Sequence, residues 1–400
     1  MTISSSESRA GFPCGRLQNL TSRRQWLGRA GGGLGMLALA DLLQQNQSLA
    51  DQLEGTIPAN GTDGNNVVFT QNPLSVRRGH FPAKAKAIIW LFMEGAPSAV
   101  DLFDPKPELN RNDGKRIDIQ VFFGDPGPLM KSPFQFKQYG ECGQWVCEHY
   151  THVAEHVDDL AFIKSCYSES DNHVPALYQI NTGLPRPGFP SAGSWITYGL
   201  GSSNQNLPGY VVLENRQGVK GGPLNWSNGF LPSSYQGTLF RTRGNPVLNL
   251  NRLPQLTETD QRSQLDLMGK LNRLHAEQHP GEADLAARIQ SFELAYRMQS
   301  EAMSAVDLKQ ETADTHRLYG IDRPESSSYG TKCLMARRLV EAGVRFVQVY
   351  SDGEWDAHNN LTKNHTEHCQ ETDVPIAGLL TDLKQRGLWD DVLVIWGGEF

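Results

Sequence analysis

Four side chains that can bind a metal ion or move a proton follow one apolar run in the 400-residue chain. The run Val344–Tyr350 is rich in β-branched and aromatic residues, and it predicts a buried strand. The polar loop after it carries Asp352, Glu354, Asp356 and His358. Because one residue separates Asp356 from His358, an extended segment can point both side chains the same way. This spacing predicts that the two side chains share one metal ion.

Acids also follow two other apolar runs. Lys86–Met93 is nearly all apolar, which is typical of a central parallel strand buried on both faces, and Glu94 and Asp101 come after it. Val392–Trp396 predicts a last buried strand, and Glu399 comes after that strand. Sites in open α/β sheets form outside the carboxyl ends of the strands. We therefore expect these acids to lie beside the polar loop described above.

Asn172 and His173 lie beyond a further apolar run. That run, Val157–Lys164, predicts a short strand after a helix near Val146–His156. Carboxylates mixed with imidazoles suit Zn, Mn or Fe, whereas acids alone favour Mg or Ca. The expected cofactor is therefore a divalent metal, with Zn, Mn, Ca and Mg all open. A pair of such ions could activate water and hold an oxygen of a phosphate or sulfate ester.

Each of these residues also has a structural interpretation. Glu94 could cap a helix, or a turn could lead to a cap at Ser98. Asp101 could brace its loop, and His173 could be a hydrogen-bonded core histidine. The remaining histidines that stand out are interpreted as solvated or packing residues: His149, His152 and His156 at helical spacing, and His365 and His368 near the start of a helix.

Strand and helix patterns alternate along the chain. Another strand is predicted at Tyr210–Leu213, and helices at Thr257–Glu277, Ala283–Ala302, Ser327–Ala342 and Asp373–Arg386. This alternation predicts an α/β fold with a doubly wound, mainly parallel sheet and helices on both faces. An irregular lobe is expected at residues 184–240. Because no helix follows the last predicted strand, we expect that the carboxyl-terminal part of the domain is missing.

The amino-terminal region has the features of an export signal. Arg23 and Arg24 precede an aromatic residue and the uncharged run Gly31–Ala40, which is too short to span a bilayer stably. Ser48–Ala50 resembles a small-residue cleavage site. This order predicts a twin-arginine signal over residues 1–50, a linker over residues 51–80 and a folded domain over residues 81–400. The alternative is an amphipathic amino-terminal helix. Export implies the twin-arginine machinery as a partner and a periplasmic or otherwise exported location.

Composition limits the class of protein. The 38% of hydrophobic residues and 20% of charged residues fit a globular chain, and they argue against a membrane protein or a disordered one. A formal net charge of -7 argues against nucleic acid as a partner. Cys142 and Cys147 are five residues apart, so they could pair in an oxidising compartment or remain free thiols.

Several short motifs occur in an order that resembles the exported bacterial family called domain of unknown function 1501. They cover nearly the whole mature chain: Phe92–Pro107, Asn172-His173, Asn181–Gly183, Gly193–Trp195, Asn206–Tyr210, Val344–Gln348, Trp355–His358 and Trp396–Phe400. Members of that family look like relatives of the alkaline phosphatase and sulfatase superfamily. The resemblance implies a metal-dependent α/β hydrolase fold. It implies metal ligands at Glu94 or Asp101, at Asp356 with His358, and at Glu399, and a nucleophile near Asn172 and His173.

Two departures from that superfamily keep a second function open. The sulfatase signature Cys-x-Pro-x-Arg does not occur, and none of the candidate nucleophiles Ser168, Ser170 and Thr182 is marked out by its surroundings. Relatives also continue past Phe400 into a segment with an Asp-His pair. The first hypothesis is an exported, metal-dependent hydrolase of small-molecule or glycan esters of sulfate or phosphate. The alternative is an exported binding or scaffold protein that keeps the fold without turnover.

Overall fold

A five-stranded parallel sheet forms the centre of the described chain. The computed structural model describes residues 72–119, 125–215, 217–278 and 283–399. The sheet has the strand order β5–β4–β6–β1–β7, and every neighbouring pair in it is parallel. Its strands are β1 (Ala87–Met93), β4 (Tyr210–Leu213), β5 (Thr238–Phe240), β6 (Phe346–Tyr350) and β7 (Val392–Gly398). A separate antiparallel hairpin joins β2 (Phe136–Tyr139) to β3 (Gln144–Cys147).

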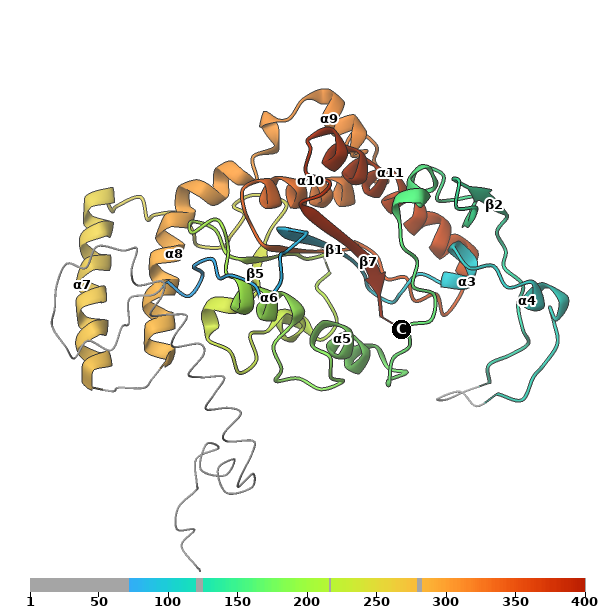
Figure 1. Ribbon diagram of the computed structural model, residues 1–400, viewed down its shortest axis with the longest axis horizontal. Coiled ribbons are helices and arrows are strands. Elements are labelled where there is room, and N and C mark those ends of the chain that lie inside the picture. The colour runs from blue at the N-terminus through green and yellow to red at the C-terminus, as the bar shows by residue number, and fades with distance from the viewer. Residues whose placement is uncertain (1–71, 120–124, 216, 279–282, 400) are drawn as a thin grey trace, which may run out of the picture. The chain divides into compact units, whose positions relative to one another are not determined.

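Helices cover both faces of this sheet (Figure 1). On one side lie α10 (Ser327–Glu341) and α11 (Leu361–Gln385), and on the other lie α5 (His173–Thr182) and α6 (Ala192–Leu200). The other helices are α3 (Ala99–Leu102), α4 (Pro107–Arg111), α7 (Glu258–Gln278), α8 (Ala283–Ala305) and α9 (Ala313–Leu318); the 3-10 helices are η1 (Val153–Asp159), η2 (Gly222–Trp226), η3 (Ser233–Tyr235) and η4 (Leu308–Gln310). The prediction of an α/β fold with a mainly parallel sheet and flanking helices is confirmed.

The central strand β1 is buried on both faces, which explains its nearly continuous apolar sequence. Successive side chains of a strand point to opposite faces of the sheet. Ile89 and Leu91 therefore enter the larger hydrophobic core, which α10 and α11 also line. Trp90 and Phe92 enter a smaller, mostly aromatic core, to which α5 contributes Leu177.

A polar side chain in the smaller core ties α5 to the sheet. Gln348 of β6 is fully buried, and its amide nitrogen donates to Asn181 of α5 at 2.8 Å. The hydroxyl of Tyr210 on β4 donates to the side-chain oxygen of Gln348. Asn181 in turn donates to the side chain of Asn225 at 3.5 Å. Because buried polar groups are costly when unpaired, this network fixes the position of α5 against the strands.

The segment before α5 differs from its prediction. Val157–Lys164 does not form a strand, and the predicted helix near Val146–His156 is replaced by strand β3 and the 3-10 helix η1. Val153 and Val157 of η1 both point into the core, so their spacing is helical rather than alternating. The Asp373 carboxylate also accepts the amide of Val153 at 2.8 Å, which satisfies a free donor at the start of η1.

Strand β7 differs from its prediction in burial. Although Val392 is 8% exposed, Leu393 and Ile395 are 50% and 37% exposed, so the strand is not buried on both faces. The strand stands at the edge of the sheet and pairs with β1 alone among the described strands. Helix α11 begins at Leu361, well before the predicted start at Asp373. The prediction missed the first half of the helix because that half is polar and lacks the apolar spacing of the second half.

Several expectations concern residues at the amino terminus. The predicted signal region 1–50 and most of the predicted linker 51–80 lie outside the described residues. Residues 72–80 contact the folded domain, since Leu74 is buried and the Arg77 amide donates to the Leu200 carbonyl at 3.0 Å. In the part of the chain that the structure describes, no helix combines the length and the apolar character needed to cross a bilayer. Cys142 and Cys147 are both free thiols, the first exposed and the second buried.

Candidate functional site

Loops that follow three adjacent strands meet at one edge of the sheet. The backbone amide of Trp355, after β6, donates to the carbonyl of Glu94, after β1, at 2.9 Å. The amide of Gly95 donates to both carboxylate oxygens of Glu399, after β7, at 3.2 and 3.1 Å. Hydrogen bonds therefore join the loops that follow β6, β1 and β7. These loops lie at the carboxyl ends of the strands, where α/β sheets bind ligands.

This meeting of loops requires a glycine at position 95. Gly95 has a φ of +81°, a left-handed conformation that side chains rarely adopt. A Cβ atom at this position would lie 2.6 Å from the backbone nitrogen of Asp356. The absence of a side chain at Gly95 thus lets the loop after β6 approach the end of β1 closely.

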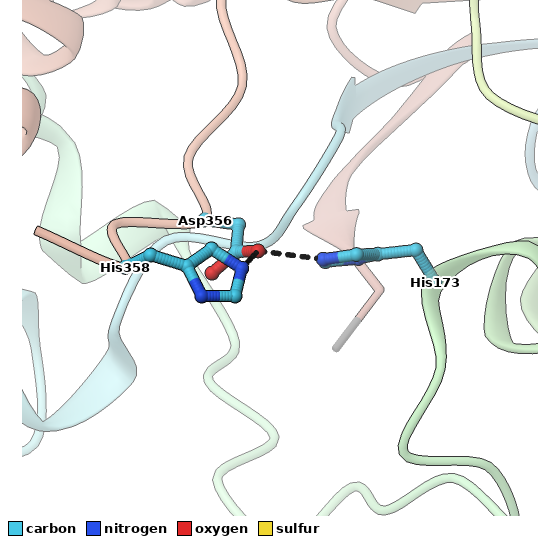
Figure 2. A group of neighbouring side chains, drawn as sticks. All are labelled: His173, Asp356 and His358. Carbon is cyan, nitrogen blue, oxygen red and sulfur yellow. Dashed lines mark hydrogen bonds and ion pairs between the residues drawn. The ribbon is translucent and has the colours of Figure 1, made fainter. Parts of the chain in front are cut away.

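Three side chains form a group whose ligand atoms all lie within 4.8 Å of one another: His173, Asp356 and His358. Nε2 of His173 lies 2.8 Å from Oδ2 of Asp356, and Nε2 of His358 lies 2.6 Å from the same oxygen. Figure 2 shows the carboxylate of Asp356 between the two imidazoles. His173 is the first residue of α5, while the other two come from the loop after β6. Two imidazoles and one carboxylate are a common ligand set for Zn²⁺ or Fe²⁺.

Two buried acids lie next to this group. Oε1 of Glu399 is 3.4 Å from Nδ1 of His173. Burial raises the pKa of Glu399 to about 8, although the hydrogen bond from the Gly95 amide has the opposite, smaller effect. Burial also raises the pKa of Glu94, although the backbone amide of Lys220 donates to Oε1 of Glu94 at 2.7 Å and opposes the shift. A buried carboxylate with a raised pKa is a feature of functional sites, and a bound cation would favour its charged form.

Asp101 lies in a different group of contacts. Its carboxylate accepts a hydrogen bond from the hydroxyl of Ser98, and the amide of Ser98 donates to Nε2 of His365 at 2.9 Å. Burial lowers the pKa of His365 to about 4, although Asp101 raises it. These contacts brace the loop after β1, and Asp101 is not part of the group formed by His173, Asp356 and His358.

Helix α11 supports the loop after β6. His368 contacts the Glu354 carbonyl through Nε2 at 3.1 Å and the Glu371 carboxylate through Nδ1 at 3.2 Å. Glu371 also accepts the amide of Asp352 at 3.1 Å. His365 and His368 are therefore packing residues that position the site, in agreement with one of the two interpretations given to them.

Asn172 acts on the backbone of α5. It is the N-cap residue of this helix, and its side chain accepts the amide of Val174 at 3.3 Å. N-cap residues satisfy amides that have no partner within the helix. Asn172 thus holds the first turn of α5, and with it His173, in place.

One known protein family matches this chain. The family described as "Protein of unknown function (DUF1501)" matches residues 85–400, which include every site residue described above. The chain belongs to this family. The match confirms the resemblance of the sequence motifs to this family. The DUF1501 chain matches no curated protein and no solved structure.

Sequence reasoning missed two contributors to the site of this DUF1501 protein. Asn215 donates to Oε2 of Glu94 at 3.1 Å, and the ammonium of Lys220 pairs with the carboxylate of Glu354. Both lie in the irregular segment after β4, for which the sequence predicts only an irregular lobe. The sequence does contain one signal for Lys220, because this lysine stands between Gly218 and the pair Gly221 and Gly222. Glycines let a loop approach a site closely, so a lysine among them is a candidate site residue.

Proposed function

We propose that this DUF1501 protein is a metal-dependent hydrolase of phosphate or sulfate esters. The observation that carries the proposal is the grouping of ligand atoms from His173, Asp356 and His358 within 4.8 Å of one another. Asp356 and His358 lie in the loop at the carboxyl end of β6, and His173 is the first residue of α5, so an anionic substrate there can also approach the first turn of this helix. The proposal includes a relationship to the alkaline phosphatase and sulfatase superfamily, which rests on the motifs of the sequence.

The residues present fit a divalent metal. His173, Asp356 and His358 would hold the ion, and Glu399 lies next to His173. A bound metal would supply Lewis acidity and lower the pKa of a bound water. Glu399, whose pKa is about 8, holds a proton at neutral pH in the metal-free protein. That proton must leave if Glu399 becomes a ligand, so metal binding would release it to solvent.

Water is the nucleophile that this arrangement favours. The hydroxyls of the three candidate nucleophiles donate to groups other than the ligand atoms of His173, Asp356 and His358: Ser168 to Gln179, Ser170 to the Asn172 carbonyl and Thr182 to the Tyr178 carbonyl. The same observation supports a second candidate function, a metal-binding or anion-binding protein without turnover. Export and a periplasmic location are part of both proposals and rest on Arg23 and Arg24.

The deciding experiment combines metal analysis with an ester screen. Purified protein would be stripped with chelator, reloaded with Zn²⁺ or Mn²⁺, and assayed with an aryl sulfate and with phenyl phosphate. We expect hydrolysis that depends on metal and is lost in Asp356→Ala. His358→Ala is assayed in parallel and should lose the same activity. Its matched control is His80→Ala, because His80 is an exposed histidine outside the site. Metal binding without turnover of either ester class would favour the binding protein. Turnover that survives chelator and the Asp356→Ala change would refute the metal-dependent hydrolase.

A further inference from the structure

The backbone of Lys220 is held firmly beside the site. Its amide donates to Glu94 at 2.7 Å, and its carbonyl accepts the side-chain amide of Asn225 at 2.7 Å. Asn225 is fully buried, and the preceding residue, Val219, belongs to the smaller hydrophobic core. Lys220 is therefore anchored on both sides, unlike a lysine on a mobile surface loop.

The ammonium of Lys220, by contrast, is accessible and weakly held. It pairs with the carboxylate of Glu354, and the two side chains are 37% and 43% exposed. Ion pairs between exposed groups contribute little, because water and salt screen them. The same Glu354 carboxylate lies 4.0 Å from Nε2 of His173, which places the lysine head at the edge of the candidate metal group.

The ammonium of Lys220 lies near the amino-terminal end of the ten-residue helix α5, because its partner Glu354 is within 4.0 Å of His173, the first residue of that helix. The amino-terminal end of a helix favours anions, as an ammonium does. A negatively charged ligand at this place would therefore compete with the exposed Glu354 carboxylate for Lys220.

We propose that Lys220 binds an anionic oxygen of the substrate, exchanging Glu354 for a phosphate or sulfate group when the ester enters the site. This inference rests on the proposed hydrolase function, and it narrows the substrates to phosphate or sulfate esters that keep a negatively charged oxygen on the tetrahedral group. An ammonium offers three donors and no acceptor, which suits such an oxyanion. Glu354 competes for Lys220 in the absence of substrate, so the two residues have opposite effects on anion affinity.

The test measures the binding of inorganic phosphate, and separately of inorganic sulfate, by calorimetry at saturating Zn²⁺. We expect Lys220→Met to weaken anion binding by about tenfold to a hundredfold, the usual effect of losing a hydrogen bond to a charged group. Lys220→Arg should retain most of the affinity, and Glu354→Gln should increase it severalfold. Lys86→Met, which removes a lysine paired with Asp391 away from the site, is the matched control.

The outcomes separate this inference from the proposed function. Metal affinity is measured first, without anion. If Zn²⁺ binds and Lys220→Met binds phosphate and sulfate as well as the unaltered protein does, the Lys220 inference is wrong and the metal site stands. A decrease of anion affinity in Glu354→Gln at saturating metal would also overturn it. If no metal binds, the proposed function fails. Anion binding by the unaltered protein and by Lys220→Met is then compared without metal. Equal binding in the two proteins, or no binding in either, refutes the role of Lys220. A preference for one of the two anions identifies the ester class.

Discussion

Gly95 donates its backbone amide to both carboxylate oxygens of Glu399, at 3.2 and 3.1 Å, and so joins the end of β1 to the end of β7. Two residues separated by most of the domain sequence thus form one wall of the candidate site. The contact depends on a backbone conformation that glycine adopts without strain, with a φ of +81°. It also gives the buried Glu399 carboxylate two of its hydrogen bonds.

Replacing Gly95 with alanine should disturb both the stability and the site. The new Cβ would lie 2.6 Å from the Asp356 nitrogen, so we expect Gly95→Ala to lower the free energy of unfolding by about 2 kcal/mol or more. Urea denaturation measures this. Gly114 has a similar φ of +77°, and no atom lies within 4 Å of the position that its Cβ would take, so Gly114→Ala is the control for backbone strain alone. Equal losses in the two variants would contradict the role of close approach.

The buried acid Glu399 should make stability depend on pH in the metal-free protein. The pKa of this carboxyl is about 8 in the folded state, compared with an ordinary value of 4.5. Between these values the folded protein keeps a proton that the unfolded chain has lost, so the free energy of unfolding should fall as pH rises, by at most about 1.4 kcal/mol per pH unit. Denaturation of Glu399→Gln should show a flatter dependence from pH 5 to 8, whereas the exposed control Glu108→Gln should follow the unaltered protein. Equal slopes in all three proteins would contradict the raised pKa.

Removing single ligands should affect stability and metal affinity to different extents. The side chain of His358 is 77% exposed, so His358→Ala should leave the metal-free melting temperature unchanged and still reduce Zn²⁺ affinity by about tenfold or more. His173→Ala should reduce the affinity and also lower stability, because this side chain is only 18% exposed and lies within 4.0 Å of three carboxylates. Calorimetric titration and thermal melting measure the two effects. Unchanged Zn²⁺ affinity in both variants would exclude this group as the metal site.

The polar network beneath α5 should be essential for stability. Gln348→Leu keeps a similar volume but leaves the hydroxyl of Tyr210 and the amide oxygen of Asn181 without their partner. We expect a loss of about 2 to 4 kcal/mol in the free energy of unfolding, measured in urea, because buried polar groups without partners are costly. The exposed residue Gln370 provides the control Gln370→Leu. A loss below about 1 kcal/mol in Gln348→Leu would show that Asn181 and Tyr210 find other partners.

The cysteines should react according to their burial. Cys142 and Cys166 are exposed, so iodoacetamide should alkylate them in the native protein. Cys147, Cys333 and Cys369 are buried and should react only after unfolding, and burial further suppresses the Cys333 and Cys369 thiols by raising their pKa. Peptide mass spectrometry before and after denaturation measures this. Native alkylation of Cys147 would contradict the packing of the hairpin.

The regular parts of the fold could be predicted from the sequence because their patterns are local. The apolar run of β1 and the strand at Tyr210–Leu213 were predicted correctly, and so were the long helices α7 and α10. The run Val157–Lys164 misled because its apolar spacing fits a helix as well as a strand. Its first three residues end the 3-10 helix η1, and the rest of the run is irregular. The start of η1 depends on a distant acid, because Asp373 accepts the amide of Val153. No local pattern reveals such a contact.

The candidate site shows the same limit. Strand-end placement predicted that Glu94, Asp356 and Glu399 would lie near one another, since parallel strands bring their carboxyl ends to one edge. Lys220 could not be found in this way, because its position depends on glycines and on the buried Asn225 rather than on a strand. Asp101 lies only seven residues after Glu94, yet it turns to Ser98.

The position of β1 within the sheet has a consequence for synthesis of the protein. This strand leaves the ribosome early, but its two neighbours, β6 and β7, begin at Phe346 and Val392. Until those segments emerge, the apolar segment of β1 has no partner strand on either of its backbone edges, and such a segment is prone to aggregation. Nascent chains of this protein should therefore depend on chaperones, and the site should assemble only as one of the last steps of folding.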